Sequence, residues 1–108
     1  MSGRLPSSLL VGALLRRVGE GGGMGMVLAR GDEQAGAILV VAVDRGSSPR
    51  LWERGVGPDG RVALIESTPA TDPDEYWRRR RSRDPDLWVI ELDVPAAERF
   101  AAETMLDD

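Results

Sequence analysis

The stretch AILVVAV, residues 37–43, decides the fold because every one of its side chains is apolar. A strand with one face in water alternates apolar and polar residues, whereas a strand covered on both faces reads as a continuous apolar run. A run of this length suits a strand better than a helix, which usually needs about ten residues or more. We therefore predict a central strand in a sheet that carries packed structure on both sides.

The neighbouring segments predict further strands of the same sheet. Residues 24–30 form a strand-like run before the central strand. Residues 50–66 hold two strand-like stretches around GPDG at 57–60, where proline is preset for the second turn position and glycine tolerates a positive φ. We predict that residues 50–66 form a β-hairpin.

Three predicted helices surround these strands. Ser7 or Ser8 is placed to cap a helix that runs to about Val18 and repeats its apolar residues on one face. A second helix should start after Asp72, because proline follows at the first helical position and glutamate stands three residues beyond the cap. A third helix is predicted to open at Pro95.

The order of these elements predicts the fold class. Residues 87–94, LWVIELDV, add a strand between the second and third helices. The resulting order is α-β-β-β-β-α-β-α, in which four strands follow one another and the last two form a hairpin. This order predicts an α+β fold with a mainly antiparallel sheet and helices packed on it. The length of 108 residues is typical of one domain, covering residues 1–108.

Several reactive residue types are missing from the chain. It contains no cysteine and no histidine, and all 14 of its basic residues are arginine. This excludes a thiolate nucleophile, a cysteine-based zinc or iron–sulfur site, a histidine base and a lysine Schiff base within the chain. We therefore expect no cofactor, no catalytic residue and no metal site, which favours a non-enzymatic protein. The absence of cysteine also fits the cytoplasm.

Three short motifs are explained by structure alone. The apolar run at 9–15 is far shorter than the roughly 20 residues that span a bilayer, so we expect no membrane association. The glycine-rich run at 19–25 follows a helix and precedes a strand, which reverses the order of a phosphate-binding loop. The tripeptide RGD at 30–32 is predicted to be a turn that leads out of a strand.

Four segments carry a resemblance to a known family. The segment RRRSRDPDLWVIELDVPAAERFAAE, residues 79–103, resembles the domain of unknown function 1491 family, which consists of small uncharacterised bacterial proteins. MVLARGD at 26–32, GAILV at 36–40 and GPDGR at 57–61 are similar to it in the same order. The resemblance implies a bacterial, cytoplasmic protein that stands as one domain. It implies no activity, substrate or functional residue.

An arginine cluster in the second helix is the candidate binding site. Five arginines lie between positions 78 and 83. At 100° per residue, three of them point away from the aromatic face of the helix. Planar guanidinium groups can bind carboxylates or phosphates in a bidentate way. The candidate interaction surface consists of Tyr76, Trp77, Arg78, Arg79 and Arg83.

This surface has three interpretations. The one we favour is docking of an acidic protein partner or of a second copy of the chain. A solvated face is the second, because acids bracket the arginines and can neutralise them locally; they are Asp72, Asp74, Glu75, Asp84 and Asp86. The third, binding of phosphate or nucleic acid, is opposed by the net charge of −4.

One pair of carboxylates offers acid–base chemistry. Glu91 and Asp93 share a strand face, with Cα atoms roughly 7 Å apart at the usual rise per residue. Such a pair can hold a divalent cation or act as a general acid and base. Alternating acids are also typical of the wet face of a half-exposed sheet. A carboxylate- or metal-dependent enzyme is therefore a further alternative.

Overall fold

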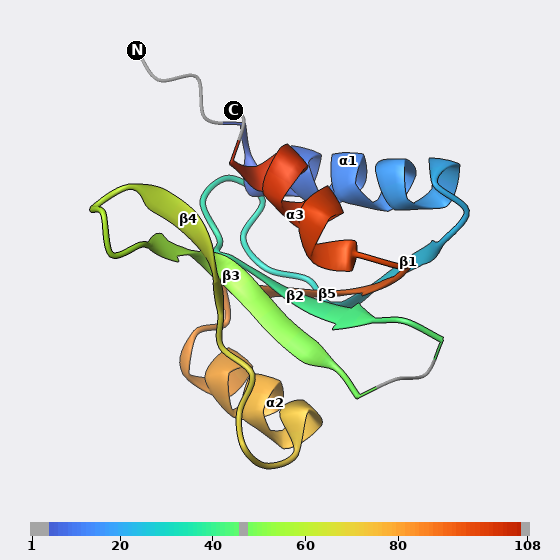
Figure 1. The fold of residues 1–108 in the computed structure, drawn as a ribbon. Helices are drawn as coiled ribbons and strands as arrows, with labels where there is room; N and C mark the ends of the chain where they lie inside the picture. The colour runs from blue at the N-terminus through green and yellow to red at the C-terminus, as the bar shows by residue number, and fades with distance from the viewer. Residues whose placement is uncertain (1–4, 46–47, 107–108) are drawn as a thin grey trace.

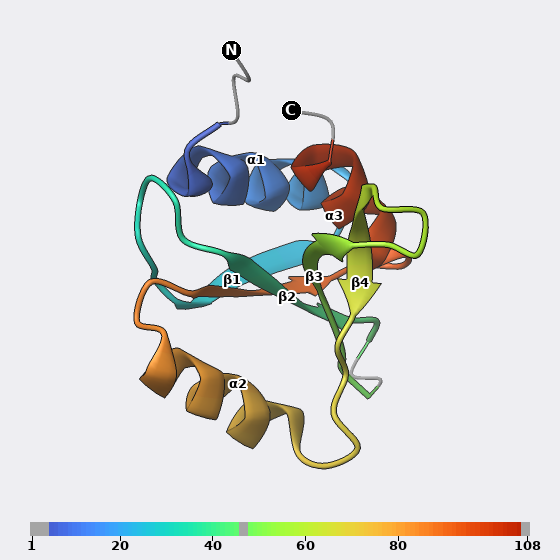
Figure 2. The same ribbon diagram turned by 90° about the vertical axis from the view of Figure 1, so that its left-hand side faces the viewer.

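A computed structural model describes residues 5–45 and 48–106 of the chain. Its elements form three layers, with α1 and α3 on one face of a five-stranded sheet and α2 on the other (Figure 1 and Figure 2). The elements are α1 Ser7–Glu20, β1 Met24–Ala29, β2 Ile38–Val43, β3 Arg50–Val56, β4 Val62–Glu66, α2 Pro73–Arg83, β5 Trp88–Asp93 and α3 Ala97–Met105. Their order along the chain and the α+β class are as predicted.

The sheet is mixed, with the strand order β1-β5-β2-β3-β4. Three of its four pairings are antiparallel, and the pairing between β2 and β5 is parallel. The hairpin of β3 and β4 is confirmed, and the sheet is mainly antiparallel as expected. The parallel pair arises because β5, which enters the sheet after α2, is inserted between β1 and β2.

The central strand is β2, and both of its faces are buried. Val40 is 0% exposed and packs in the core between the sheet and the helices α1 and α3. Val41 is 2% exposed and packs in a second core on the α2 side, which includes Trp77. The continuous apolar run therefore lies between two helical layers, as its sequence predicts.

The start of α1 differs from the prediction, because neither serine side chain caps the helix. The N-cap residue is Pro6, and the Ser7 hydroxyl instead donates a hydrogen bond to the Gly36 carbonyl at 2.5 Å. The free N–H groups of the first turn are satisfied by another loop, since Ser7 and Ser8 donate to the carbonyls of Gln34 and Glu33. The helix is thus capped from 25 or more residues away, which local sequence cannot show.

Of the other two predicted helix starts, that of α2 is confirmed and that of α3 is wrong by two residues. Asp72 caps α2 as predicted, with its Oδ1 accepting the backbone N–H of Asp74 at 2.9 Å. The helix α3 begins at Ala97 rather than at Pro95. Ala96 has a left-handed φ of 56°, which interrupts helical geometry directly after the proline. Along the described ranges, no helix combines the length and apolar character needed to cross a membrane.

Candidate interaction surface

The aromatic side of α2 attaches the helix to the sheet. Trp77 is 8% exposed and lies in the second core, with Tyr76 half-buried beside it. The indole N–H of Trp77 donates to Asp74 Oδ1 at 3.2 Å, so the polar end of this buried ring is satisfied. Two of the five predicted surface residues, Tyr76 and Trp77, therefore act mainly as supports for the helix.

Two arginines also hold α2 in place. Arg80 Nη1 lies 2.6 Å from Glu53 Oε2 on β3, and both side chains are half-buried. Arg81 donates to the backbone carbonyl of Arg30 at 2.5 Å, beyond the end of β1. Burial by itself would raise the pKa of Glu53, but the hydrogen bond and the positive charge of Arg80 outweigh it and lower that pKa. The carboxylate that binds this cluster thus comes from β3 rather than from the bracketing acids.

The remaining arginines, Arg78, Arg79 and Arg83, are exposed as predicted. None of the three forms an ion pair with a carboxylate of the described residues. The guanidinium of Arg78 lies over the Trp77 ring, 5.1 Å from its centroid, which restricts the orientation of that side chain. The local neutralisation by bracketing acids that the sequence suggested is not realised as ion pairs on this face.

The Arg80–Glu53 pair allows a test of how α2 is held. Replacing Arg80 by alanine is expected to lower the free energy of unfolding by about 1–3 kcal/mol near neutral pH, because Glu53 loses its charged donor. The pKa of Glu53 is lowered in the folded state, so the stabilisation is present above the unfolded pKa of about 4.3 and is lost as the pH falls through the folded value. Urea denaturation of the wild type and variant as a function of pH measures both effects.

The control for this test is Arg79→Ala, which alters an exposed neighbour on the same helix. Its unfolding free energy should stay within about 0.5 kcal/mol of the wild type. An Arg80→Ala loss that is the same at all pH values would contradict the role assigned to the Glu53 carboxylate.

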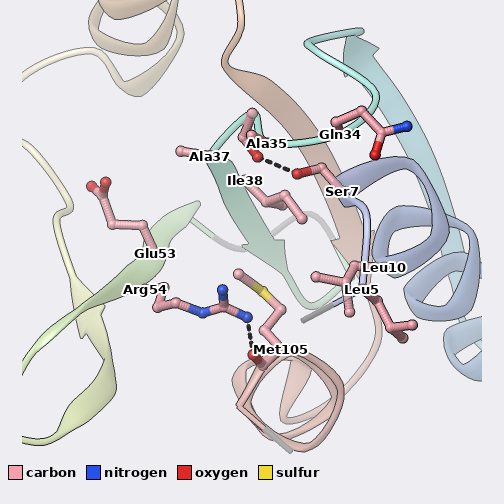
Figure 3. A pocket seen from close by; sticks show the side chains of 11 residues that line it. Leu5, Ser7, Leu10, Gln34, Ala35, Ala37, Ile38, Glu53, Arg54 and Met105 are labelled. Atoms are coloured by element: carbon pink, nitrogen blue, oxygen red, sulfur yellow. Dashed lines mark hydrogen bonds between the residues drawn. The ribbon is translucent and has the colours of Figure 1, made fainter. Parts of the chain in front are cut away.

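A cavity of about 290 Å³ lies on the other face of the sheet, between the start of α1, the loop before β2, β3 and the end of α3. Figure 3 shows the Arg54 side chain extending across it to the backbone carbonyl of Met105, to which it donates a hydrogen bond. The carboxylate of Glu53 points away from this guanidinium. Sequence reasoning missed the cavity because its walls come from four separate segments.

The chemistry of the cavity is limited by its lining. Its only hydroxyl, that of Ser7, donates to the Gly36 carbonyl, and its one carboxylate, that of Glu53, is paired with Arg80. Apolar side chains from α1, β2 and α3 supply much of the remaining wall. The cavity therefore has space and one arginine side chain, but it has no nucleophile in contact with a base.

The predicted carboxylate pair, Glu91 and Asp93, lies half-buried on β5. Asp93 Oδ1 accepts the backbone N–H of Arg45 at 3.1 Å, which ties the end of β5 to the loop after β2. Among the residues that the structure describes, no group of three or more acids gathers as metal ligands would. One carboxylate of the pair thus has a structural partner.

Comparisons with known proteins found one matching family model and several similar solved structures. A family model described as a protein of unknown function (DUF1491) matches residues 5–102. The fold is similar to a crystal structure of a DUF1491 family protein from Caulobacter crescentus CB15, at 36% identity and a TM-score of 0.77, covering 89% of this chain and 94% of that one. It is also similar to a solution structure from A. tumefaciens, at 28% identity and a TM-score of 0.73, covering 97% and 96%. No curated protein matches it.

Proposed function

The chain belongs to the DUF1491 family of proteins of unknown function, and from its surface we propose that it is a non-enzymatic, cytoplasmic interaction module that binds an acidic protein partner. The contact surface is the outer side of α2. The observation that carries the proposal is the exposure of Arg78, Arg79 and Arg83 on an anchored helix, with no carboxylate of the described residues paired to them.

The anchoring of α2 supports this role because a rigid surface loses little entropy on binding. Trp77 is buried, Arg80 is paired with Glu53, and Arg81 is bonded to the Arg30 carbonyl. These three contacts fix the rotation of the helix about its axis. The outward arginines are therefore presented in one orientation, which favours specific binding.

The charge pattern of the free side also favours a partner. Arg79 and Arg83 stand four residues apart on the helix, a spacing at which like charges repel each other modestly. Carboxylates of a partner relieve this repulsion, and each guanidinium can bind one of them in a bidentate way. Arginine is also enriched at the energetic centres of protein interfaces.

Nucleic acid fits this surface less well. Asp84 and Asp86 are exposed directly after the arginines, and the whole chain carries a net charge of −4. A continuous phosphate backbone that crosses the helix would meet these acids, whereas separate carboxylates of a folded protein can avoid them. Binding of phosphate through the same arginines remains the second candidate function, and the experiment below separates the two.

Reversing the exposed arginines should abolish binding and leave the fold intact. We expect Arg78→Glu/Arg79→Glu/Arg83→Glu to bind a fluorescein-labelled decaglutamate peptide at least about tenfold more weakly than the wild type, because the surface then repels carboxylates. Fluorescence anisotropy at physiological ionic strength measures this binding. Pulldown from the native cytosol, followed by mass spectrometry, then identifies proteins that the wild type retains and the variant loses.

The matched control is Arg16→Glu/Arg61→Glu/Arg99→Glu, which makes the same change in net charge at exposed positions away from α2. It should bind the peptide as the wild type does. If both variants bound the peptide equally weakly, only the net charge of the protein would matter, and the outer side of α2 would be refuted as the binding surface. Submicromolar binding of RNA or DNA, falling steeply with salt and lost only in the α2 variant, would favour the second candidate.

A further inference from the structure

The strand β1 is an edge of the sheet, and its first four residues, 24–27, pair with β5 in regular register before a shift between Val27 and Ala29. It is first in the strand order and pairs with β5 on one side only. Every second residue of such a strand directs its N–H and C=O away from the sheet, where they can pair with another strand. The sequence of β1 is MGMVLA, which lacks the charges and prolines that usually protect an edge. Met24 and Met26 are 76% and 53% exposed.

The opposite edge strand, β4, has charged residues at its ends, which oppose pairing with another strand. Arg61 precedes it, and its last residue, Glu66, forms an ion pair with Arg50 at 2.8 Å. Hydrogen bonds from Arg50 and Thr68 lower the pKa of Glu66 to about 2, so this carboxylate keeps its charge in moderately acidic solution. The strand β4 also lies beside α3 (Figure 2), so it presents a less open edge than β1.

The two exposed methionines lie on the part of the sheet that α2 leaves open. A Cβ at Gly25 would lie 2.6 Å from Leu15 of α1, so Gly25 faces α1. Met24 and Met26, its neighbours in the strand, face the opposite side of the sheet. They pair in register with Asp93 and Glu91 of β5, away from the Trp77 core.

We propose that two copies of this chain associate by pairing their β1 strands antiparallel about a two-fold axis, which joins the two sheets edge to edge. With Gly25 at the axis, Met24 lies opposite the partner's Met26, so each exposed methionine gains an apolar neighbour across the strands. The axis closes the assembly as a dimer.

A second copy fits this edge better than a charged partner strand does. The strand has no charge with which to match such a partner, and an uncharged strand does not repel its own copy. The nearest acid in the register, Glu91, would lie level with the partner's Asp93, three strand spacings away, roughly 14 Å at about 4.8 Å per strand. This distance exceeds the Debye length of about 8 Å at physiological salt, so the like charges are screened.

The flank of α1 above this edge is consistent with the pairing. Arg17 binds Thr104 and Glu103 of α3, so that side of α1 faces the monomer. Gly12 and Gly19 lie on the other flank, where a Cβ would meet nothing within 4 Å. A two-fold axis perpendicular to the joined sheet brings the α1 helix of each copy to the same face. Glycines on this flank then allow the two helices to approach closely.

The test is the oligomeric state of the wild type and of two matched lysine variants. Met26→Lys and Val62→Lys add the same charge at edge-strand positions that are both 53% exposed. We expect the wild type to sediment at twice 11.7 kDa at high micromolar concentration. Met26→Lys should raise the dissociation constant at least about tenfold, because a charge enters the apolar row between the sheets. Val62→Lys should leave it unchanged.

Amide hydrogen exchange identifies the edge that is used. The outward-facing amides of β1 should be protected at dimer concentrations and exchange faster on dilution, whereas the amides of β4 should not respond. A wild type that stays monomeric, or a Met26→Lys variant that dimerises as tightly as the wild type, would overturn the proposal. Loss of the dimer in Val62→Lys alone would assign it to the other edge. If Met26→Lys fails to fold, Met24→Lys replaces it at a position that is 76% exposed.

Discussion

Replacing either Val40 or Val41 by aspartate is expected to unfold the protein. The two side chains are 0% and 2% exposed, on opposite faces of β2. The buried clusters in which they pack, under α1 and α3 and against α2, consist of hydrophobic residues. Burying an unpaired carboxylate, or protonating it to avoid the charge, should cost more than about 4 kcal/mol, a large part of the roughly 5–15 kcal/mol that stabilises a domain.

Thermal melts followed by circular dichroism measure this effect, and Val62→Asp provides the control. Val62 is 53% exposed on β4, so the same substitution there should change the melting temperature little. If only one of the two β2 variants loses its cooperative transition, the other face of the strand is open to solvent and the three-layer arrangement is wrong on that side.

Replacing Gly31 or Gly36 by alanine should produce the second large loss of stability. A Cβ at either position would collide with the carbonyl oxygen of Asp86. This oxygen also accepts the backbone N–H of Asp32 at 3.0 Å, so it cannot move aside without breaking that bond. Because the obstacle is backbone, we expect each substitution to lower the free energy of unfolding by at least about 2 kcal/mol, more than the roughly 1 kcal/mol of an average point substitution.

The matched control is Gly12→Ala in α1, where a Cβ meets nothing within 4 Å in the monomer. Alanine is the better helix former, so this variant should gain up to about 1 kcal/mol in urea denaturation, measured at a concentration where the protein is monomeric. Wild-type stability in Gly36→Ala would show that the loop before β2 does not depend on its close contact with Asp86.

This contact joins three of the segments that carry the family resemblance. Gly31 lies in MVLARGD at 26–32, Gly36 is the first residue of GAILV at 36–40, and Asp86 lies in the segment 79–103. The three segments meet at the carbonyl group of Asp86. A further contact between them is the indole N–H of Trp88, which donates to the Asp32 carbonyl at 2.7 Å. The RGD tripeptide leads out of β1 as predicted, but the turn itself lies at residues 33–35, where Asp32 Oδ2 accepts the backbone N–H groups of Gln34 and Ala35.

Local patterns in the sequence were sufficient for the elements and their faces. The apolar run at 37–43 predicted a strand buried on both sides, GPDG predicted the hairpin, and Asp72 predicted the start of α2. Helical periodicity also separated the exposed arginines from the aromatic face. These predictions succeeded because each depends on the period of a strand or helix, or on turn and cap geometry, within about ten residues of sequence.

The tertiary structure alone decided which segments became neighbours. It placed β5 between β1 and β2, paired Arg80 with Glu53 across 27 residues, and left β1 as an edge with two exposed methionines. It also capped α1 with loop carbonyls, which made the two serines unnecessary as caps. Periodicity shows which face of a segment is apolar, but it does not show which other segment covers that face. That choice depends on the packing of the whole chain, because contacts distant in sequence compete for the same apolar surface and the same backbone hydrogen bonds.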